Sequence, residues 1–454
     1  MVTAGSQANE ASPTEVRDVT CTQCGCVCDD LVFQIRNNQL HSWKPSCQLA
    51  DPWYRLLQQT DAGSLPVLVN GRAAAYEVAI AEAARLLRHS RSPLIYGLSR
   101  SSTPGQRAAT ELADLIGATI DTTASTCHAP SIIALQNVGE ATSTLGEVKN
   151  RSDLVIYWGS NPVDSHPRHI ERLVNTPGRF VPEGRAGRHV VIVDPEATAS
   201  SEVADTFIQI GRGADFEVIW ALRSLLRGHP IPDHVGGISR SDLTALFERM
   251  LNCRYGVVFF GMGLAGQEGG HHSVQALLEL VIELNERTHF VARRMRIPGD
   301  VAGADSVLCW QTGYPFSVSL GRGYPRYNPG EYTASVLLEN QEVDCVVLVG
   351  GEGVRKMSEM AQQNLKKVPT ILLDYPGRFD FSNPTVRFTT AVYGVHRDGV
   401  AYRMDEVPVP LKAFLTSTLP ADHDVLSALT LALRQDFEPV IPLPSHKLDS
   451  TDRP

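Results

Sequence analysis

The sequence predicts an α/β fold built on parallel β-sheets. Six short apolar runs, most of them ending in Gly or Asp, alternate with amphipathic segments of helical length. Continuous runs of Val, Ile and Leu are typical of strands that are buried on both faces, as in parallel sheets covered by helices. Ligands of such sheets bind beyond the carboxyl ends of the strands. The six runs are Pro93–Leu98, Asp153–Gly159, Val190–Asp194, Tyr255–Gly261, Cys345–Gly350 and Thr370–Asp374, and the clearest helical segments are Gln106–Ile116, Asp215–Leu226 and Ser273–Asn285.

The chain divides into four expected parts. Residues 1–18 are small and polar, lack the apolar core of a secretory signal, and are expected to form a disordered tail. Residues 19–62 form a Cys-rich domain with a strand at Leu31–Arg36. Residues 63–415 hold the α/β units, and residues 416–454 hold a C-terminal helix and a loose tail. Within the third part, the stretch Arg293–Glu331 is rich in Gly, Pro and aromatic residues and suits a long functional loop.

The composition excludes several classes of function. With 454 residues, of which 43% are hydrophobic and 20% charged, the chain is ordinarily globular. Its net charge of −9 argues against nucleic acid as a partner, because phosphate binding favours a basic face. We find no apolar run long enough to span a bilayer. Since no secretory signal is recognised either, a cytoplasmic location is expected, and a disulfide framework is not.

The cysteines near the amino end predict a metal site. Cys21, Cys24 and Cys28 lie on one tight loop, and Cys47 follows further along the chain. Four thiolates in this arrangement are typical of a [4Fe–4S] cluster, and Gly25 would let the backbone turn close to the sulfides. A structural zinc site is the main alternative, although zinc ribbons usually pair two C-x-x-C knuckles and this segment has one. Inert cysteines are the third interpretation.

A second candidate site lies at Cys127, which follows a run of small residues and precedes His128. The stretch Pro130–Val138 has the pattern of a helix with Pro near its start, and a Cys just before a helix has a lowered pKa. A soft thiolate suits molybdenum, tungsten, iron or copper. From these residues alone, a buried structural cysteine and a cysteine nucleophile remain open alternatives.

Several long strings resemble the B subunits of formylmethanofuran dehydrogenases. They occur in order from about Val19 to about Lys412. Those subunits are similar in turn to molybdopterin oxidoreductases of formate dehydrogenase-like architecture, so the resemblance implies Rossmann-like parallel sheets and a small N-terminal Fe–S domain. The strings are TCTQCGCVCDDL, TASTCHAPSIIALQNVGEATSTLGEVKNRSDLVIYWGSNPVDSHPRH, VVIVDPEAT, MRIPGDVAGA, WQTGYPFSVSLGRGYPRYNPGEYTA and GVAYRMDEVPV.

The resemblance implies two kinds of cofactor. Cys21, Cys24, Cys28 and Cys47 would bind one [4Fe–4S] cluster. Cys127 would be the protein ligand of molybdenum or tungsten, whose other ligands would come from two molybdopterin guanine dinucleotides.

The implied reaction is the two-electron interconversion of CO2 and formate. His128 and Arg296 would flank the open metal position. Arg296 would hold the carboxylate by charge-assisted hydrogen bonds, and His128 would relay a proton. Formylation or deformylation of methanofuran would take place elsewhere in a complex, with an amidohydrolase-like A subunit, with a C subunit, and with either a small barrel-shaped D subunit or a formyltransferase.

The strand ends are expected to bind the two dinucleotides. Gly lets a backbone approach phosphate closely, and Asp194 could accept hydrogen bonds from guanine. For each position, a tight β–α turn without a ligand is the alternative. The expected contacts are Gly159, Asn161, Asp194, Gly261, Gly263, Gln311, Thr312, Gly313, Gly350 and Asp374.

Two features depart from the pattern of the resembling subunits. No Lys follows Cys47, although many of those subunits carry one between cluster and pterin. The segment from Gly350 to Gly353 also differs, so the second dinucleotide could bind differently or be absent. The alternative function is that of a non-redox, structural B-type subunit in a bacterial formyltransferase/hydrolase complex of C1 oxidation. Retention of all four cluster cysteines and of Cys127 favours the redox function.

Overall fold

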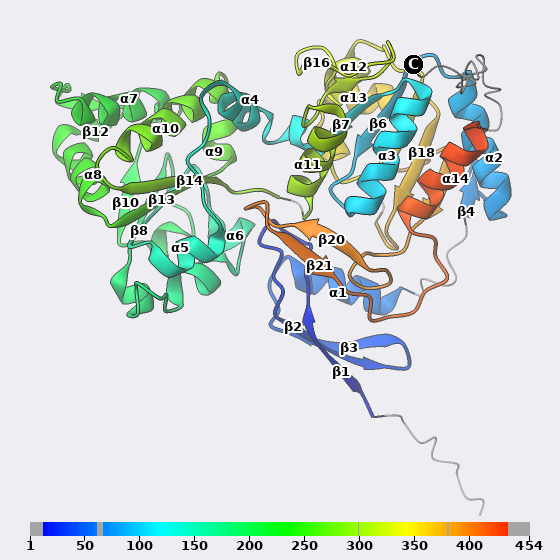
Figure 1. Ribbon diagram of the computed structural model, residues 1–454, viewed down its shortest axis with the longest axis horizontal. Helices are drawn as coiled ribbons and strands as arrows, with labels where there is room; N and C mark the ends of the chain where they lie inside the picture. The colour runs from blue at the N-terminus through cyan, green and yellow to red at the C-terminus, as the bar shows by residue number, and fades with distance from the viewer. Residues whose placement is uncertain (1–11, 61–66, 298, 379–380, 435–454) are drawn as a thin grey trace, which may run out of the picture.

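The computed structural model describes residues 12–60, 67–297, 299–378 and 381–434. Two helix-covered sheets lie in the two halves of the molecule, and the N-terminal strands lie below them (Figure 1). The six predicted strands are all present and parallel to their neighbours in these two sheets, which confirms the predicted α/β fold. No helix of the described residues is both long and apolar enough to cross a membrane.

The first sheet has five strands in the order β10-β9-β8-β13-β14, and all pairs are parallel. Strands β8, β9 and β10 follow one another from the centre of the sheet to one edge, and β13 and β14 follow one another from the centre to the other edge. The direction reverses between β8 and β13, and such a reversal opens a crevice at the carboxyl ends of the strands. The strands are β8 (Leu154–Trp158), β9 (His189–Asp194), β10 (Thr206–Gln209), β13 (Tyr255–Phe260) and β14 (His289–Arg294).

Helices cover this sheet because each presents an apolar stripe to it. One face packs in a common core with the helices α7, α8 and α10, while the other packs against the N-terminal segment. The helices of this half are α4 (Ala129–Val138), α5 (Leu145–Arg151), α6 (Pro162–Ser165), α7 (Asp215–Leu226), α8 (Arg240–Asn252), α9 (Met262–Ala265) and α10 (Gly270–Leu284), and a small hairpin is formed by β11 (His234–Val235) and β12 (Ile238–Ser239).

The second sheet has nine strands in the order β16-β15-β7-β6-β17-β18-β19-β4-β5. Its five central strands are parallel, its edges are antiparallel, and the chain direction reverses between β6 and β17. The strands are β4 (Val67–Val69), β5 (Arg72–Ala74), β6 (Pro93–Gly97), β7 (Thr119–Thr122), β15 (Val318–Ser319), β16 (Arg326–Tyr327), β17 (Cys345–Val349), β18 (Thr370–Asp374) and β19 (Val386–Thr389). The helices are α2 (Tyr76–His89), α3 (Thr103–Ile116), α11 (Val301–Thr312), α12 (Ala334–Glu339), α13 (Glu359–Leu365) and α14 (Asp422–Arg434).

The N-terminal segment forms a three-stranded antiparallel sheet and one helix. It consists of β1 (Thr14–Val19), β2 (Leu31–Arg36), β3 (Gln39–Lys44) and α1 (Ala50–Gln59). The expected tail over residues 1–18 is therefore wrong for residues 14–18, because they belong to strand β1, which pairs with β2. Residues 1–11 lie outside the described residues, as do residues 435–454 of the expected C-terminal tail. The strand predicted at Leu31–Arg36 is confirmed.

The segment predicted as a long loop contains a helix. Helix α11 begins after Asp300, whose side chain accepts a hydrogen bond from the Gly303 N–H at 3.1 Å, and ends at Gly313 in a left-handed conformation. An N-terminal cap and a C-terminal Gly are the usual limits of a helix, and this stretch has both in spite of its loop-like composition. After the second sheet, the hairpin β20 (Gly399–Tyr402) and β21 (Pro408–Leu411) lies between the N-terminal segment and the two sheets (Figure 1).

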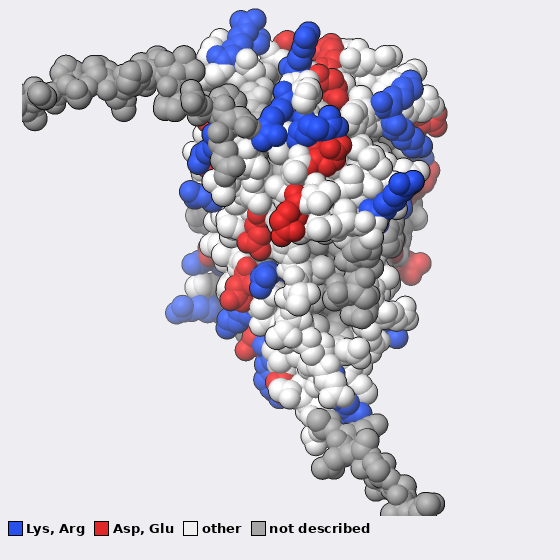
Figure 2. Space-filling view, turned by 90° about the vertical axis from the view of Figure 1, so that its right-hand side faces the viewer, with Lys and Arg blue, Asp and Glu red and all other residues white. Residues whose placement is uncertain are grey.

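The face of the molecule shown in Figure 2 is mixed in charge. On the face shown in Figure 2, the Lys and Arg side chains lie among Asp and Glu side chains. This face therefore lacks the continuous basic surface that a nucleic acid would require.

Candidate active site

A cavity of about 370 Å³ lies at the carboxyl end of the five-stranded sheet. It occupies the crevice between the loops that follow β8 and β13, where the chain direction reverses. The segment after β14 and the pair Cys127 and His128 form further parts of its wall, and Lys356 reaches it from the loop after β17 of the other sheet. Its lining includes Cys127, His128, Gly159, Ser160, Asn161, His166, Gly261, Met262, Gly263, Met295, Ile297 and Lys356.

Cys127 lies between a short 3-10 helix, Thr123–Thr126, and α4, so its position before a helix is confirmed. Its side chain is buried. Burial raises the pKa of the thiol, and the nearby cations Arg296 and Lys356 only partly oppose this effect. The expected lowering of the Cys127 pKa is therefore wrong, because removal from water outweighs these charges. A metal cation bound at this position would still favour the thiolate.

His128 presents an unpaired nitrogen. Its Nε2 lies 3.0 Å from the Met295 carbonyl oxygen, which can only accept, so Nε2 carries the proton. Its Nδ1 is buried and has no hydrogen-bond partner. Burial and the neighbouring cations Arg296 and Arg294 lower the pKa of His128 well below its usual value. The imidazole is therefore neutral, with the lone pair on Nδ1.

Arg296 is completely buried and forms an ion pair with Asp305 of α11. Asp305 also accepts a hydrogen bond from the Thr122 hydroxyl at 2.7 Å. The Nε of Arg296 has no partner. The cation predicted to hold a carboxylate is thus already neutralised by an acid, and it keeps one free N–H donor.

The main chain at Arg296 joins the two predicted metal sites. Its carbonyl oxygen accepts a hydrogen bond from the Gly25 N–H of the cysteine loop at 3.1 Å and lies 2.9 Å from Nε2 of His166, which lines the cavity. The carbonyl oxygen of Gly25 in turn accepts from the Met404 N–H at 2.8 Å. The cysteine loop therefore packs directly against the segment that carries Arg296.

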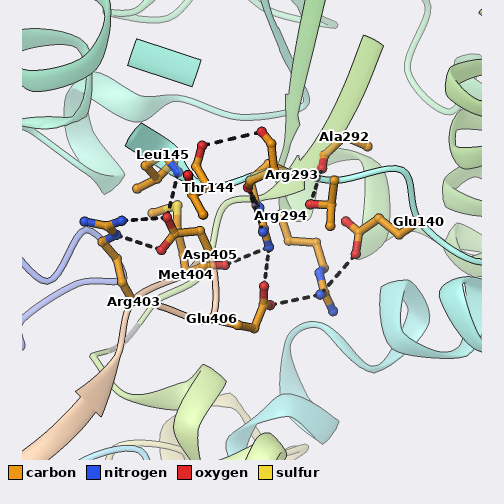
Figure 3. Close-up of polar contacts among 12 residues, drawn as sticks. Glu140, Thr144, Leu145, Ala292, Arg293, Arg294, Arg403, Met404, Asp405 and Glu406 are labelled. Atoms are coloured by element: carbon orange, nitrogen blue, oxygen red, sulfur yellow. Dashed lines mark hydrogen bonds and ion pairs between the residues drawn. The ribbon is translucent and has the colours of Figure 1, made fainter. Parts of the chain in front are cut away.

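A network of ion pairs on two buried arginines fixes this segment (Figure 3). Arg293 contacts Glu406 at 2.5 Å, and Arg294 contacts both Glu406 at 3.3 Å and Glu140 at 3.2 Å. The adjacent Asp405 accepts from the backbone N–H at the start of α5 at 2.6 Å. The network ties the end of β14, the chain before α5 and the β20–β21 hairpin together. The Arg294–Glu140 pair is buried on both sides, and breaking a buried pair is costly.

The cysteines near the amino end gather in one core. Cys21, Cys24 and Cys28 are buried, and Cys47 packs against the same core. A hydrogen bond from the Cys21 N–H to the Cys28 carbonyl at 2.7 Å closes the loop. Among the described residues, no group of three or more His, Cys, Asp or Glu side chains has the arrangement of a metal-ion site. The assignment of these four cysteines to a cluster therefore stays a prediction.

The structure separates the residues expected to contact the dinucleotides. Gly159, Gly261 and Gly263 line the cavity, as does Asn161, whose amide donates to Asp164 at 2.7 Å. The remaining six expected contacts lie outside its lining: Asp194, Gln311, Thr312, Gly313, Gly350 and Asp374.

Gly350 lies instead just after β17, at the reversal point of the nine-stranded sheet, and Asp374 ends the neighbouring strand β18. The Asp374 carboxylate accepts hydrogen bonds from Arg100 at 3.2 Å and from the Gly351 N–H at 3.0 Å. Glu352 lies beside the same arginine, with an oxygen 3.6 Å from its Nε. Asp374 and Glu352 therefore both contact the guanidinium group of Arg100.

The sequence did not identify several residues of the site, among them Lys356 and Asp305. Lys356 enters the cavity from a different sheet, and nothing in its local sequence indicates a ligand. Asp305 occupies a helix position within a segment predicted as a loop, so its pairing with Arg296 could not be anticipated.

No protein-family model matches the chain. It is 36% identical over 435 residues to a protein of Methanocaldococcus jannaschii that is named as the B subunit of tungsten-containing formylmethanofuran dehydrogenase 2, covering 92% of this chain and 99% of that protein. The protein of the same name from Methanococcus maripaludis is 34% identical, covering 91% of this chain and 97% of that protein.

The chain is also similar to a bacterial protein. The B subunit of the formyltransferase/hydrolase complex Fhc of Methylorubrum extorquens is 26% identical over 279 residues, which are 62% of this chain and 73% of that protein. A crystal structure of the complex FhcABCD from this organism with methylofuran contains a chain of the same fold, with a TM-score of 0.69 and 22% identity. The match covers 81% of this chain and 99% of that chain.

Proposed function

The chain belongs to the family of formylmethanofuran dehydrogenase B subunits, and from this premise we propose that it interconverts CO2 and formate at a tungsten or molybdenum centre. The Cys127 thiolate and two molybdopterin guanine dinucleotides would hold the metal. The bound metal would supply the two-electron chemistry, while the chain supplies position and proton transfer. The names of the relatives from the two methanogens, which include tungsten, support this choice of metal.

The observation that carries the proposal is the cavity beside Cys127. A buried thiol borders a space of about 370 Å³, and the buried Nδ1 of His128, which lines this space, has no partner. The buried Nε of Arg296 also has none; Arg296 lies outside the lining, while its neighbours Met295 and Ile297 belong to it. Buried polar atoms are normally paired, so these two fit a site whose ligand supplies their partners. The loops after β8 and β13, which carry Gly159 and Gly261, meet at a reversal of chain direction, and nucleotides bind at such reversals in α/β sheets.

The residues beside Cys127 suit formate. Oxidation of formate to CO2 releases one proton and two electrons, and the neutral His128 can accept that proton at Nδ1. The free Nε–H of Arg296 can donate to a carboxylate oxygen, while Asp305 holds the guanidinium in place. CO2 reduction uses the same groups, with protonated His128 as the donor.

The proposed electron carrier is a [4Fe–4S] cluster on Cys21, Cys24, Cys28 and Cys47. The donor set supports it, since three buried thiols come from one closed loop and the fourth packs against the same core. The cysteine loop also contacts the Arg296 segment through Gly25, which gives a short protein path between cluster and cavity.

We place the chain in a larger complex. Formylation or deformylation of methanofuran would occur on an amidohydrolase-like partner, together with a C subunit and either a small barrel-shaped partner or a formyltransferase. The likeness to a chain of the FhcABCD structure supports assembly with several subunits.

Metal analysis and a redox assay of the purified complex test the proposal. We expect tungsten or molybdenum together with about four irons per chain. Formate should reduce a viologen dye in the same preparation. An intact complex free of tungsten, molybdenum and pterin, and unable to oxidise formate, would defeat the proposal.

The second candidate is a structural role, in which the chain organises a formyltransferase and a hydrolase without redox chemistry. The match that covers 99% of a chain in the Fhc complex favours it. This function predicts that Cys127→Ser leaves both complex assembly and the hydrolysis of formylated methanofuran unchanged. A large loss of hydrolysis in that variant would count against it.

A further inference from the structure

Two buried histidines hold neighbouring carbonyl groups at the wall of the cavity. Nε2 of His128 lies 3.0 Å from the Met295 carbonyl oxygen, and Nε2 of His166 lies 2.9 Å from the Arg296 carbonyl oxygen. Both histidines line the cavity, and each is only 1% exposed. A carbonyl oxygen can only accept, so each Nε2 carries a proton and donates it. The main chain at these two residues is therefore held from two different loops, one before α4 and one after α6.

The second ring nitrogen distinguishes the two histidines. Nδ1 of His128 is buried and has no partner, whereas Nδ1 of His166 lies 2.9 Å from the Ser165 hydroxyl. Burial lowers the pKa of His166 to about 4, so its imidazole is neutral and Nδ1 can accept a hydrogen bond from that hydroxyl. Both ring nitrogens of His166 thus lie within hydrogen-bond distance of protein groups, which fits a role in position and not in proton transfer.

The Arg296 carbonyl oxygen is the point where His166 meets the cysteine loop. This oxygen accepts from the His166 Nε2–H and also from the Gly25 N–H, the latter at 3.1 Å. A carbonyl oxygen has two lone pairs, so these two donors use its full capacity. The residues on either side of Arg296, Met295 and Ile297, line the cavity. Loss of the His166 donor would therefore loosen the cavity wall and one anchor of the cysteine loop together.

We propose that His166 is a positioning residue, which fixes the cavity wall for substrate binding and holds the Arg296 carbonyl against the cysteine loop. The inference deepens the proposed function, because the substrate whose binding it affects is formate. The contact of His166 is to the main chain, and this contact is the same before and in the transition state. Its loss should therefore raise the KM for formate and leave kcat nearly unchanged.

Two amide substitutions separate the Nε2–H donor from the bulk of the imidazole. The side-chain nitrogen of Gln lies at about the position of Nε2 of His, whereas that of Asn lies at about the position of Nδ1. His166→Gln can therefore still donate to the Arg296 carbonyl, and His166→Asn is too short to reach it. In the viologen assay of the intact complex, H166N should raise the KM for formate about fivefold, the value of one ordinary hydrogen bond. H166Q should keep a KM near that of the wild type.

Hydrogen–deuterium exchange of the intact complex, read by mass spectrometry, gives a second readout that needs no catalysis. H166N should speed exchange in the peptide that contains Gly25, because the Gly25 N–H donates to the carbonyl that the imidazole holds. H166Q should exchange as the wild type does.

The control variant is His189→Asn. His189 begins β9, at the opposite end of the five-stranded sheet from the cavity, and its Nε2 lies 2.9 Å from the Thr206 hydroxyl. Loss of this contact should leave both the KM for formate and the exchange of the Gly25 peptide unchanged.

The outcomes distinguish this inference from the proposed function. A raised KM and faster Gly25 exchange in H166N, both restored in H166Q, support it. Equal behaviour of the two variants overturns it, as does a change in only one of the two readouts. If H166N fails to assemble, H166Q decides, since wild-type values support the role and impaired values refute it. A wild-type complex that oxidises no formate contradicts the proposed function and the effect on KM, while the exchange data still decide whether His166 holds the cysteine loop.

Discussion

A methyl group at Gly25 should disturb both predicted metal sites at once. A Cβ at this position would lie 2.4 Å from the Arg296 carbonyl oxygen and 3.2 Å from the Met404 Cβ. Ordinary contact begins at about 3.4 Å, so the cysteine loop and the Arg296 segment would have to separate by about 1 Å in Gly25→Ala. The atom in the way belongs to the backbone and cannot rotate aside.

The cost of this separation follows from two terms. Forcing an extra methyl into a packed site costs about 1–3 kcal/mol. The hydrogen bond from the Gly25 N–H to the Arg296 carbonyl, 3.1 Å long, would also weaken, at about 1 kcal/mol. We therefore expect Gly25→Ala to lose about 2–4 kcal/mol of unfolding free energy.

Urea unfolding followed by tryptophan fluorescence measures this loss. Iron analysis measures how much iron the cysteine loop still binds per chain. We expect a lower unfolding midpoint and less iron per chain in Gly25→Ala. The control is Gly146→Ala on α5, where the nearest atom to a new Cβ lies 3.7 Å away. That variant should gain up to about 1 kcal/mol from helix propensity. If Gly25→Ala matches the wild type in stability and iron content, the loop does not pack on Arg296 as described.

Three further predictions concern charges in and near the site. Asp305→Asn removes the anion beside buried Arg296 and should lower the unfolding free energy by about 3–5 kcal/mol, whereas an unchanged urea midpoint would contradict the ion pair. Burial raises the pKa of the Cys127 thiol, and the positive charge of Lys356 opposes this rise. Lys356→Ala should therefore slow the alkylation of Cys127 by iodoacetamide in metal-free protein. Faster alkylation would show that the Lys356 charge does not act on this thiol. Burial raises the pKa of Asp300 from 3.8 to about 8, so the folded state binds more protons than the unfolded state between these values and stability falls as pH rises through them. Asp300→Asn should make unfolding less dependent on pH in this window, and an equally steep dependence would refute the assignment.

The fold could be predicted where local pattern decides structure. The apolar runs became β6, β8, β9, β13, β17 and β18 because continuous Val, Ile and Leu residues favour strands buried on both faces. The helix after Cys127 followed from Pro near its start. Helix α11 was missed because glycines and aromatic residues on either side of it gave the stretch the composition of a loop.

The site could be predicted only where residues are adjacent in sequence or share strand ends. Gly159 and Gly261 meet at one cavity because both follow parallel strands of the five-stranded sheet, and Cys127 and His128 are adjacent in sequence. That this Cys-His pair lies beside the two glycines could not be predicted, because the pair follows β7 of the other sheet. Lys356 reaches the cavity from a loop of the nine-stranded sheet, and no local sequence pattern predicts that it lies there.

Two electrostatic properties of the site also needed the structure. The pairing of Arg296 with Asp305 and the raised pKa of Cys127 depend on burial and on distance in space. Neither quantity is encoded in spacing along the chain.

Tungsten and molybdenum content, measured in the purified complex for the wild type, Cys127→Ser and the control Cys309→Ser, tests the central claim most directly. Cys309 is an exposed cysteine on α11, so its replacement should leave the metal in place. We expect one tungsten or molybdenum per chain in the wild type and the control, and a large loss of that metal in Cys127→Ser with iron retained. Equal metal content in all three proteins, or none in the wild type, would contradict the assignment of Cys127 as the metal ligand.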